Sequence, residues 1–177
     1  MNVLGISGSP RKNGNTVILV DHALKPFQDA GWETQRFFMS EKTIQPCVAC
    51  DICQQTGSCA MKGDDRDTLL EAYIRCDAVI IGSPVYYRNV TAQLKALFDR
   101  SYSFGRYKPL EGKPAGAIAV GRGEGAGQSL VLTITYNYFL SMGAVCVPGE
   151  LNGLSAKAIG YGDIISQDRR LRQAAIL

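Results

Sequence analysis

Four cysteines lie within thirteen residues of this 177-residue chain, at the spacing C-x2-C-x2-C-x5-C. They are Cys47, Cys50, Cys53 and Cys59. Three thiols spaced in this way can point inward from one tight loop, and the fourth can complete a set of four ligands. A cubane iron–sulfur cluster needs four thiolates around a compact core. The spacing therefore predicts a [4Fe–4S] cluster on this segment.

Zinc, disulfide bonds and free thiols are the alternatives for these cysteines. Structural zinc sites typically have two C-x-x-C pairs with a longer spacer, whereas here three cysteines share one knuckle. Disulfides are typical of small secreted chains, and a chain of this length can build an apolar core without them. The spacing favours the cluster, and zinc or a set of free, redox-active thiols stays open.

The composition is that of an ordinary globular chain, with 46% hydrophobic and 20% charged residues. We expect one domain over residues 1–177. The formal charge of +3 is small and no basic and aromatic stripe is present, so no nucleic-acid partner is indicated. No secretory signal precedes the apolar run Val3–Ile6, and no apolar stretch is long enough to span a membrane. We expect a cytoplasmic location, where thiols stay reduced.

Short apolar runs alternate with segments of helical length, which is typical of a parallel sheet covered on both faces. This pattern favours an α/β, flavodoxin-like doubly wound fold of five strands in the order 2-1-3-4-5, with ligands at the carboxyl ends of the strands. The predicted strands are Asn2–Ile6, Glu33–Phe38, Ala78–Gly82, Ala115–Val120 and Ala144–Val147. The predicted helices are about Asn15–Ala30, Asp65–Arg75, Thr91–Tyr102, Gly127–Met142 and Asp163–Ala175.

The cysteines lie in a long connection, a loop over about 39–64 that follows the second predicted strand. Connections of this length in compact domains usually have a function. The loop leaves the ligand-binding edge of the sheet, but the second strand lies beyond the first, away from the third and fourth. We therefore expect a cluster on this loop to face the cofactor of a neighbouring subunit more closely than that of its own chain.

The first predicted strand runs into a polar loop and then a helix, with the sequence Ser7-Gly-Ser-Pro-Arg-Lys-Asn-Gly-Asn-Thr16. Its hydroxyls, amides and N–H groups favour a bound phosphate, as does the dipole of a helix capped by Asn15 or Thr16. Arg11 can add a charge-assisted contact. Because the loop lacks both G-x-G-x-x-G and GK[ST], it does not indicate a dinucleotide or P-loop site. The alternative is a polar turn before a capped helix.

Two further loops at the same edge of the predicted sheet suit a flat ring. After the third strand, the run Gly82-Ser-Pro-Val-Tyr-Tyr-Arg-Asn89 offers free backbone beyond Pro84 and two tyrosines that can stack on a ring or pack at its rim. After the fourth strand, Gly121-Arg-Gly-Glu-Gly-Ala-Gly-Gln128 lets the backbone approach a flat ligand closely. Together the three loops predict a site for flavin mononucleotide (FMN).

These motifs resemble a known family. Gly8-Ser-Pro-Arg-Lys-Asn-Gly-Asn-Thr16, Ser83-Pro-Val-Tyr86 and Leu94-Lys-Ala-Leu-Phe-Asp-Arg100 look like the NAD(P)H-dependent FMN reductase superfamily, and the cysteine motif looks like its iron–sulfur flavoprotein branch. The resemblance implies FMN, a [4Fe–4S] cluster, a homo-oligomer (dimer or tetramer) and electron transfer between a ferredoxin-type or NAD(P)H donor and a small acceptor. The residues expected to bind FMN are Ser7, Ser9, Pro10, Arg11, Asn13, Asn15, Thr16, Pro84, Val85, Tyr86, Tyr87 and Gly121.

No side chain is expected to act as a catalytic acid or base, because FMN exchanges one or two electrons and a cluster exchanges one. Two alternatives stay open: an NAD(P)H-dependent FMN or quinone reductase without a cluster, and a non-catalytic FMN-binding or zinc-stabilised module. Among the remaining charged residues, an ion pair at a helix end explains Asp99 and Arg100. Capping of the next helix explains the run Gly63–Asp67.

Overall fold

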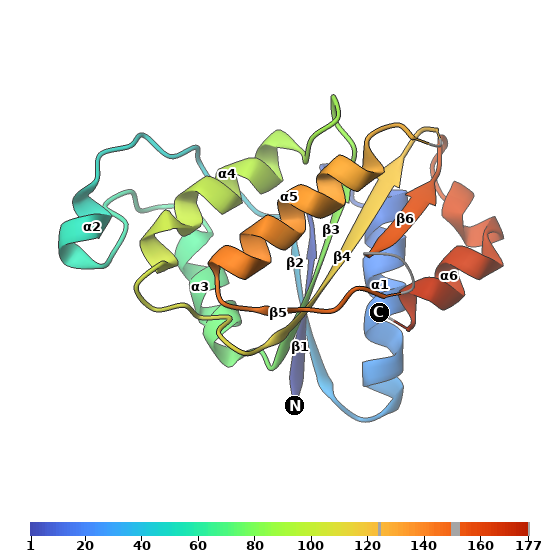
Figure 1. Cartoon of the computed structure of the whole chain (residues 1–177), viewed down its shortest axis with the longest axis horizontal. Helices are drawn as coiled ribbons and strands as arrows, with labels where there is room; N and C mark the ends of the chain where they lie inside the picture. Colours follow the sequence, from blue (N-terminus) through green and yellow to red (C-terminus); the bar gives the residue numbers. More distant parts are fainter. Residues whose placement is uncertain (124, 150–152, 177) are drawn as a thin grey trace.

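The computed structural model describes residues 1–123, 125–149 and 153–176. A six-stranded parallel sheet lies between two layers of helices (Figure 1). Five strands follow the predicted order β2-β1-β3-β4-β5: β1 Asn2–Ser7, β2 Glu33–Phe38, β3 Ala78–Pro84, β4 Pro114–Gly121 and β5 Val145–Cys146. The helices are α1 Asn15–Asp29, α2 Ile52–Thr56, α3 Arg66–Arg75, α4 Ala92–Arg100, α5 Gln128–Ser141 and α6 Asp168–Ala174. The predicted flavodoxin-like fold is confirmed.

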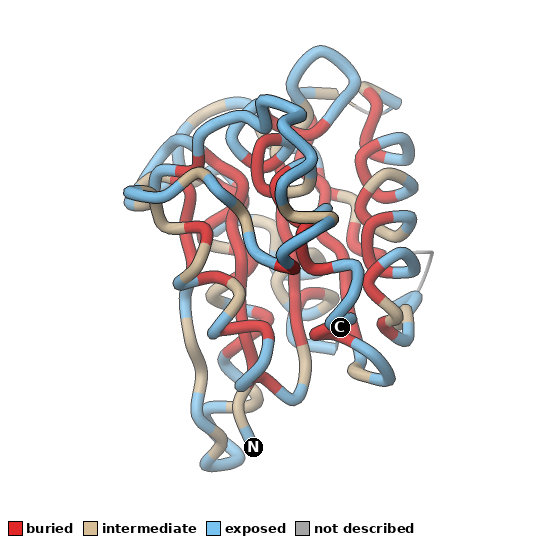
Figure 2. Tube along the Cα trace, turned by 90° about the vertical axis from the view of Figure 1, so that its left-hand side faces the viewer, coloured by how far each residue is buried: buried red, intermediate tan, exposed pale blue. Residues whose placement is uncertain are grey.

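The central strands are buried on both faces, which is why they form nearly continuous apolar runs. Leu4 of β1 and Ile81 of β3 pack on one side with helices α3, α4 and α5. Val3 and Ile80 pack on the other side with helices α1 and α6. Figure 2 shows the buried residues concentrated in the interior of the molecule.

Helix α1 packs closely on β1 and β3 because glycines face it. A methyl group at Gly82 would lie 2.7 Å from Val20 Cγ2 and 3.0 Å from Thr16 Cγ2. A methyl group at Gly5 would lie 2.7 Å from Leu24 Cδ1. These two glycines therefore let α1 pack closely on β1 and β3, and Gly82 brings the first turns of α1 against the carboxyl half of β3.

The edge of the sheet beyond β4 differs from the prediction of five strands. The predicted strand Ala144–Val147 is reduced to the two residues of β5, and a sixth strand, β6 (Leu154–Lys157), pairs with Ile118–Gly121 of β4. Pro148 has no N–H to continue the ladder, so β5 ends and β6 takes its place beside the carboxyl half of β4. The run Leu-Ser-Ala-Lys was missed because only two of its residues are apolar.

Two predicted helices are shorter than expected. Helix α4 ends at Arg100 and continues as the 3-10 turn η1 (Ser101–Phe104). The predicted helix Asp163–Ala175 is divided at Gln167 into the 3-10 turn η2 (Asp163–Ser166) and α6. In the described part of the chain, no helix combines the length and apolar character needed to cross a membrane.

The connection between β2 and α3 forms a lobe beside the sheet, with the short helix α2 at its tip (Figure 1). Its length agrees with the predicted loop, whereas α2 was not predicted. Most side chains between residues 45 and 60 are exposed or only half-buried. The lobe therefore has little apolar core of its own and must be held by polar contacts.

Gly82→Ala is expected to destabilise the protein by about 1–3 kcal/mol, because the added methyl group overlaps side chains of α1 in a close-packed interior. Urea denaturation measures the change. Gly105→Ala is the matched control, since the nearest atom to a methyl group there, the Tyr102 carbonyl oxygen, lies at an ordinary 3.4 Å. Equal stability of the two variants would show that α1 does not pack tightly on β3.

Candidate cofactor sites

A pocket of about 240 Å³ lies at the carboxyl ends of β1, β3 and β4. Its walls come from the three loops predicted to bind FMN and from a fourth loop after β6. Eight predicted residues line it: Ser9, Arg11, Asn15, Thr16, Pro84, Val85, Tyr86 and Gly121. The fold thus gathers loops that are more than a hundred residues apart in the sequence. Glu124, in the glycine-rich run after β4, lies outside the described residues.

The first turn of α1 offers free backbone N–H groups to this pocket. Gly14 occupies the N-cap position and makes no side-chain cap, so the prediction that Asn15 or Thr16 caps the helix is wrong. Asn15 instead holds the loop after β6, because its Nδ2 donates to the Gly160 carbonyl (2.7 Å) and its Oδ1 accepts from the Ile164 N–H (3.1 Å). The first N–H groups of a helix have no intrahelical partner and favour an anion.

Two serines shape the loop between β1 and α1. The Ser9 N–H donates to Ser7 Oγ (3.3 Å), and Ser9 Oγ accepts from the Arg11 N–H (3.1 Å). The guanidinium carbon of Arg11 lies 4.8 Å from the ring centroid of Tyr161, which also lines the pocket. This cation–π contact keeps a positive charge beside the open N-terminus of α1.

The loop after β3 turns back as a two-residue hairpin. Tyr86 and Asn89 exchange backbone hydrogen bonds of 2.9 and 3.0 Å, and the two residues between them, Tyr87 and Arg88, have φ angles of 51° and 63°. This left-handed conformation costs a non-glycine residue about 1–2 kcal/mol. The hairpin places Tyr86 in the pocket lining and leaves Tyr87 fully exposed. The predicted FMN residues outside the lining are Ser7, Pro10, Asn13 and Tyr87.

Thr91, which sequence reasoning missed, ties the loops after β1 and β3 together. Its Oγ1 donates to the Gly8 carbonyl (2.6 Å) and accepts from the Leu94 N–H (3.2 Å), so it is also the N-cap of α4. Its own N–H donates to Ser83 Oγ (3.4 Å), and the side chain is fully buried. The signal that could have found it is a threonine directly before a helix.

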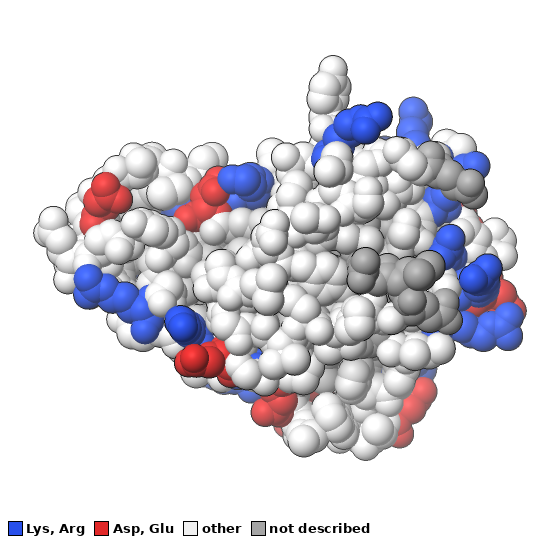
Figure 3. Space-filling model, in the orientation of Figure 1, with Lys and Arg blue, Asp and Glu red and all other residues white. Residues whose placement is uncertain are grey.

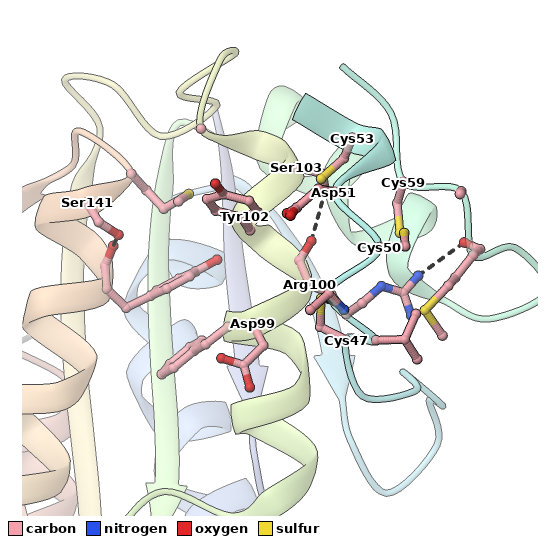
Figure 4. A pocket seen from close by; sticks show the side chains of 18 residues that line it. Cys47, Cys50, Asp51, Cys53, Cys59, Asp99, Arg100, Tyr102, Ser103 and Ser141 are labelled. Atoms are coloured by element: carbon pink, nitrogen blue, oxygen red, sulfur yellow. Dashed lines mark hydrogen bonds between the residues drawn. The ribbon is translucent and has the colours of Figure 1, made fainter. Parts of the chain in front are cut away.

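All four predicted cluster ligands line a second pocket, of about 680 Å³ (Figure 4). Cys47 and Cys50 are exposed, Cys53 and Cys59 are half-buried, and each is a free thiol. Within the described ranges, no group of three or more Cys, His, Asp or Glu has the geometry to hold a metal ion. The four cysteines therefore line one pocket, but in the described residues their side chains do not converge on a common point.

The backbone between the cysteines is tightly turned. Ala49 and Asp51 have φ angles of 50° and 55°, and Gly57 has a φ angle of 71°. The Ala49 N–H points at Cys47 Sγ, at a distance of 3.4 Å between nitrogen and sulfur. Two left-handed non-glycine residues in three positions wrap the chain so that the cysteines face the same pocket.

Arg100, at the end of α4, holds both ends of the cysteine segment. Its Nη1 donates to the Gln45 carbonyl (3.1 Å) and to Asp64 Oδ2 (2.8 Å), and its Nη2 donates to the Met61 carbonyl (3.1 Å). Only 1% of the Arg100 side chain and 4% of the Asp64 side chain are exposed. Figure 4 shows the Arg100 side chain extending toward the labelled cysteines.

These contacts correct two expectations for the charged residues. Asp99 pairs with Lys95 (2.6 Å) rather than forming a helix-end pair with Arg100. Asp64 does accept from the Arg66 N–H at the start of α3 (3.2 Å), but its other oxygen binds Arg100 and the Gln45 N–H (2.9 Å). Asp64 therefore joins the cysteine lobe to both helices.

The ion pair stays charged at neutral pH. Burial alone would lower the pKa of Arg100, but Asp64 and the neighbouring Cys59 raise that pKa above its usual value. Burial would raise the pKa of Asp64, but the Gln45 and Arg66 N–H groups and the Arg100 guanidinium hold that pKa below 3.8. The stability that Asp64 contributes is therefore present above its unfolded pKa and is lost as the pH falls through the lowered pKa.

One polar atom beside the cysteines lacks a partner. The buried Nε of Arg100 has no hydrogen-bond acceptor among the residues that the structure describes. A buried N–H without a partner is costly, and an anionic group in the pocket would satisfy it. Four thiols, a fixed positive charge and a free donor fit a thiolate-bound iron–sulfur cluster, whose sulfurs accept hydrogen bonds.

Comparison with known proteins identifies the family. Residues 1–157 match the model of the NADPH-dependent FMN reductases. The chain belongs to this family. It is 41% identical to an iron–sulfur flavoprotein of Methanocaldococcus jannaschii over 79% of this chain and 72% of that protein. It is 36% identical to an iron–sulfur flavoprotein of Methanosarcina thermophila over 83% of this chain and 77% of that protein. These relatives place it in the iron–sulfur flavoprotein branch.

Solved structures share the fold at low identity. A flavone reductase matches with a TM-score of 0.73 and 16% identity, over 99% of this chain and 60% of that chain. The Trp repressor binding protein from Bacillus subtilis matches with a TM-score of 0.69 and 22% identity, over 99% of both chains. These likenesses show the flavodoxin-like fold, and family membership confirms the prediction of an oxidoreductase with FMN as a cofactor.

Thr91→Val is expected to destabilise the protein by about 1–3 kcal/mol, because it removes the cap of α4 and leaves the Gly8 carbonyl without its donor. The free energy of unfolding in urea measures the effect. Thr68→Val, at an exposed position of α3, is the control and should retain the stability of the unmodified protein. A Thr91→Val variant as stable as this control would contradict the assigned role.

Proposed function

We propose that this protein transfers electrons through FMN and a [4Fe–4S] cluster, from a ferredoxin-type or NAD(P)H donor to a small acceptor. FMN occupies the pocket at the start of α1, and the ligands of the cluster are Cys47, Cys50, Cys53 and Cys59. The observation that carries the proposal is the gathering of all four cysteines in one pocket around a buried, charged Arg100.

The residues of the first pocket bind and orient FMN. The open N–H groups at the start of α1 and the Arg11 guanidinium hold the phosphate, and the backbone around Pro84 and Gly121 borders the ring. Tyr86 supplies an aromatic face at the rim. When bound, FMN exchanges one or two electrons and the cluster exchanges one, so no side chain in the pocket has to act as an acid or base.

The two pockets lie at opposite ends of α4. Thr91 at its start contacts the loop after β1, whereas Arg100 at its end contacts the cysteine segment. The nine residues of the helix span about 13 Å. Electron transfer slows steeply with distance, so a homo-oligomer that brings the cysteine pocket of one protomer to the FMN of another offers a shorter route.

The outer surface of α5 supports such an assembly, as a dimer or tetramer. None of the fourteen residues of this helix is charged, and Figure 3 shows a broad surface over it without Lys, Arg, Asp or Glu. Leu130 and Leu140 are 46% and 62% exposed there. An uncharged surface with exposed leucines is typical of the interface between copies of one chain.

A second candidate is an NAD(P)H-dependent reductase that works with FMN alone. The description of the family as NADPH-dependent favours it, and Cys47 and Cys50 would then be exposed free thiols. The two candidates differ in iron content and in the effect of removing one cysteine.

Protein purified without oxygen is expected to contain about four iron and four sulfide ions per chain, and its absorbance should show a broad shoulder beside the flavin bands. Cys59→Ser should lose most of this iron, because the cubane needs four thiolates. The control Cys146→Ser, a thiol of β5 outside the lobe, should keep it. Iron-free protein whose flavin is reduced rapidly by NADPH would instead support the reductase without a cluster.

Arg11→Ala is expected to weaken FMN binding about tenfold, the effect of losing one charge-assisted contact of roughly 1.5 kcal/mol to the phosphate. Fluorescence titration of the flavin-free protein with FMN measures the dissociation constant. The neighbouring exposed Lys12 does not line the pocket, so Lys12→Ala is the control and should bind FMN normally. Unchanged affinity in Arg11→Ala would place that guanidinium in solvent rather than on the phosphate.

A further inference from the structure

Gln45 and Met61 bracket the segment that carries the four thiols, since each lies two residues outside the first or last cysteine. Their carbonyl oxygens bind the same guanidinium, that of Arg100, at 3.1 Å each. One side chain from α4 thus closes the loop without any bond between the cysteines themselves. Every acceptor in this closure belongs to the protein itself, so the contacts do not require iron.

Asp64 fixes how that guanidinium is oriented. Its Oδ2 binds Arg100 Nη1 (2.8 Å) and also accepts from the Gln45 N–H (2.9 Å). Both Nη atoms of Arg100 donate to acceptors in Gln45, Met61 and Asp64. The Nε atom is buried and has no acceptor in the described residues. Cys59 lines the same pocket as Arg100, and its side chain interacts with this guanidinium.

We propose that Arg100 is a positioning residue that closes the cysteine loop before the cluster binds and then holds its positive charge against the cluster beside Cys59. This inference rests on the proposed function, because its second part requires a cluster on these cysteines. Arg100 then has two separable effects. The planar guanidinium fixes the geometry of the loop, and the positive charge of Arg100 raises the reduction potential of the cluster.

The physical basis of the second effect is electrostatic. A cluster with four thiolate ligands is anionic, and its negative charge increases on reduction. A buried positive charge beside it stabilises the reduced form more than the oxidised form, because Coulomb interactions are strong away from water. Hydrogen bonds to cluster sulfurs act in the same direction. Arg100 therefore raises the reduction potential.

The test compares Arg100→Lys and the double variant Asp64→Asn/Arg100→Gln with the unmodified protein. The double variant leaves no buried carboxylate unpaired. The Arg100→Lys variant keeps the positive charge but lacks the planar guanidinium that binds several acceptors at once. Lys95→Gln removes the same charge from an exposed position on the same helix and is the matched control. Bound FMN and far-ultraviolet circular dichroism show that each variant is folded.

Amide hydrogen exchange on iron-free protein measures loop closure. We expect residues 45–61 to exchange at least tenfold faster in Arg100→Lys and in the double variant, with unchanged exchange at the start of α1. Spectroscopic redox titration of the loaded proteins measures the cluster. The double variant should titrate at least 59 mV lower than an Asp64→Asn variant, from which it differs only in the charge of residue 100, and 59 mV is a tenfold change for one electron. Arg100→Lys should shift less than the double variant, and Lys95→Gln should shift in neither measurement.

Outcomes that overturn the proposal differ from those that overturn the proposed function. Unchanged exchange over residues 45–61 in a folded Arg100→Lys variant would exclude the closing role. Equal potentials in Asp64→Asn and the double variant would exclude the electrostatic role, while the iron content would still support the proposed function. Unmodified protein that binds no iron would overturn the proposed function and the electrostatic role, and the exchange data would still decide whether Arg100 closes the loop.

Discussion

Removing a guanidinium from water costs several kcal/mol unless an anion and further acceptors replace the lost water. In this protein Arg100 meets that requirement with one carboxylate and two carbonyl oxygens, and all three belong to the cysteine lobe. The lobe has little apolar core, since most of its side chains are exposed. Its conformation therefore depends on this buried ion pair, and losing one partner would cost about 3–5 kcal/mol.

Helix α4 also connects the cysteine lobe to the proposed FMN pocket. Thr91 caps the start of the helix, and its hydroxyl donates to the Gly8 carbonyl. Arg100 is the last residue of the helix, and its guanidinium donates to the Met61 carbonyl of the cysteine segment. Buried Leu94 and Leu97 pack the helix against the sheet, so both ends are fixed to one core. The two proposed cofactor pockets are thereby held at opposite ends of one short helix, at a distance that the chain cannot shorten by itself.

Much of this arrangement could be predicted from the sequence, because it follows from local patterns. Buried strands such as Ala78–Pro84 are recognised by continuous apolar runs, and the polar loops follow them directly. The missed features depend on contacts distant in sequence. Arg100 binds residues 36 to 55 positions away, so it resembled an ordinary helix-end charge. Likewise, β5 ends at Cys146, shortly before Pro148, and β6 pairs with the edge of β4 that is left beyond it.

We propose that one chain carries both an FMN pocket and a four-cysteine cluster held by Arg100. Diffraction from crystals grown without oxygen, with data collected at the iron absorption edge, can locate the cluster. We expect an anomalous iron peak bonded to Cys47, Cys50, Cys53 and Cys59, with the Arg100 guanidinium beside Cys59. A peak only at the zinc edge, or iron ligated by other residues, would contradict it.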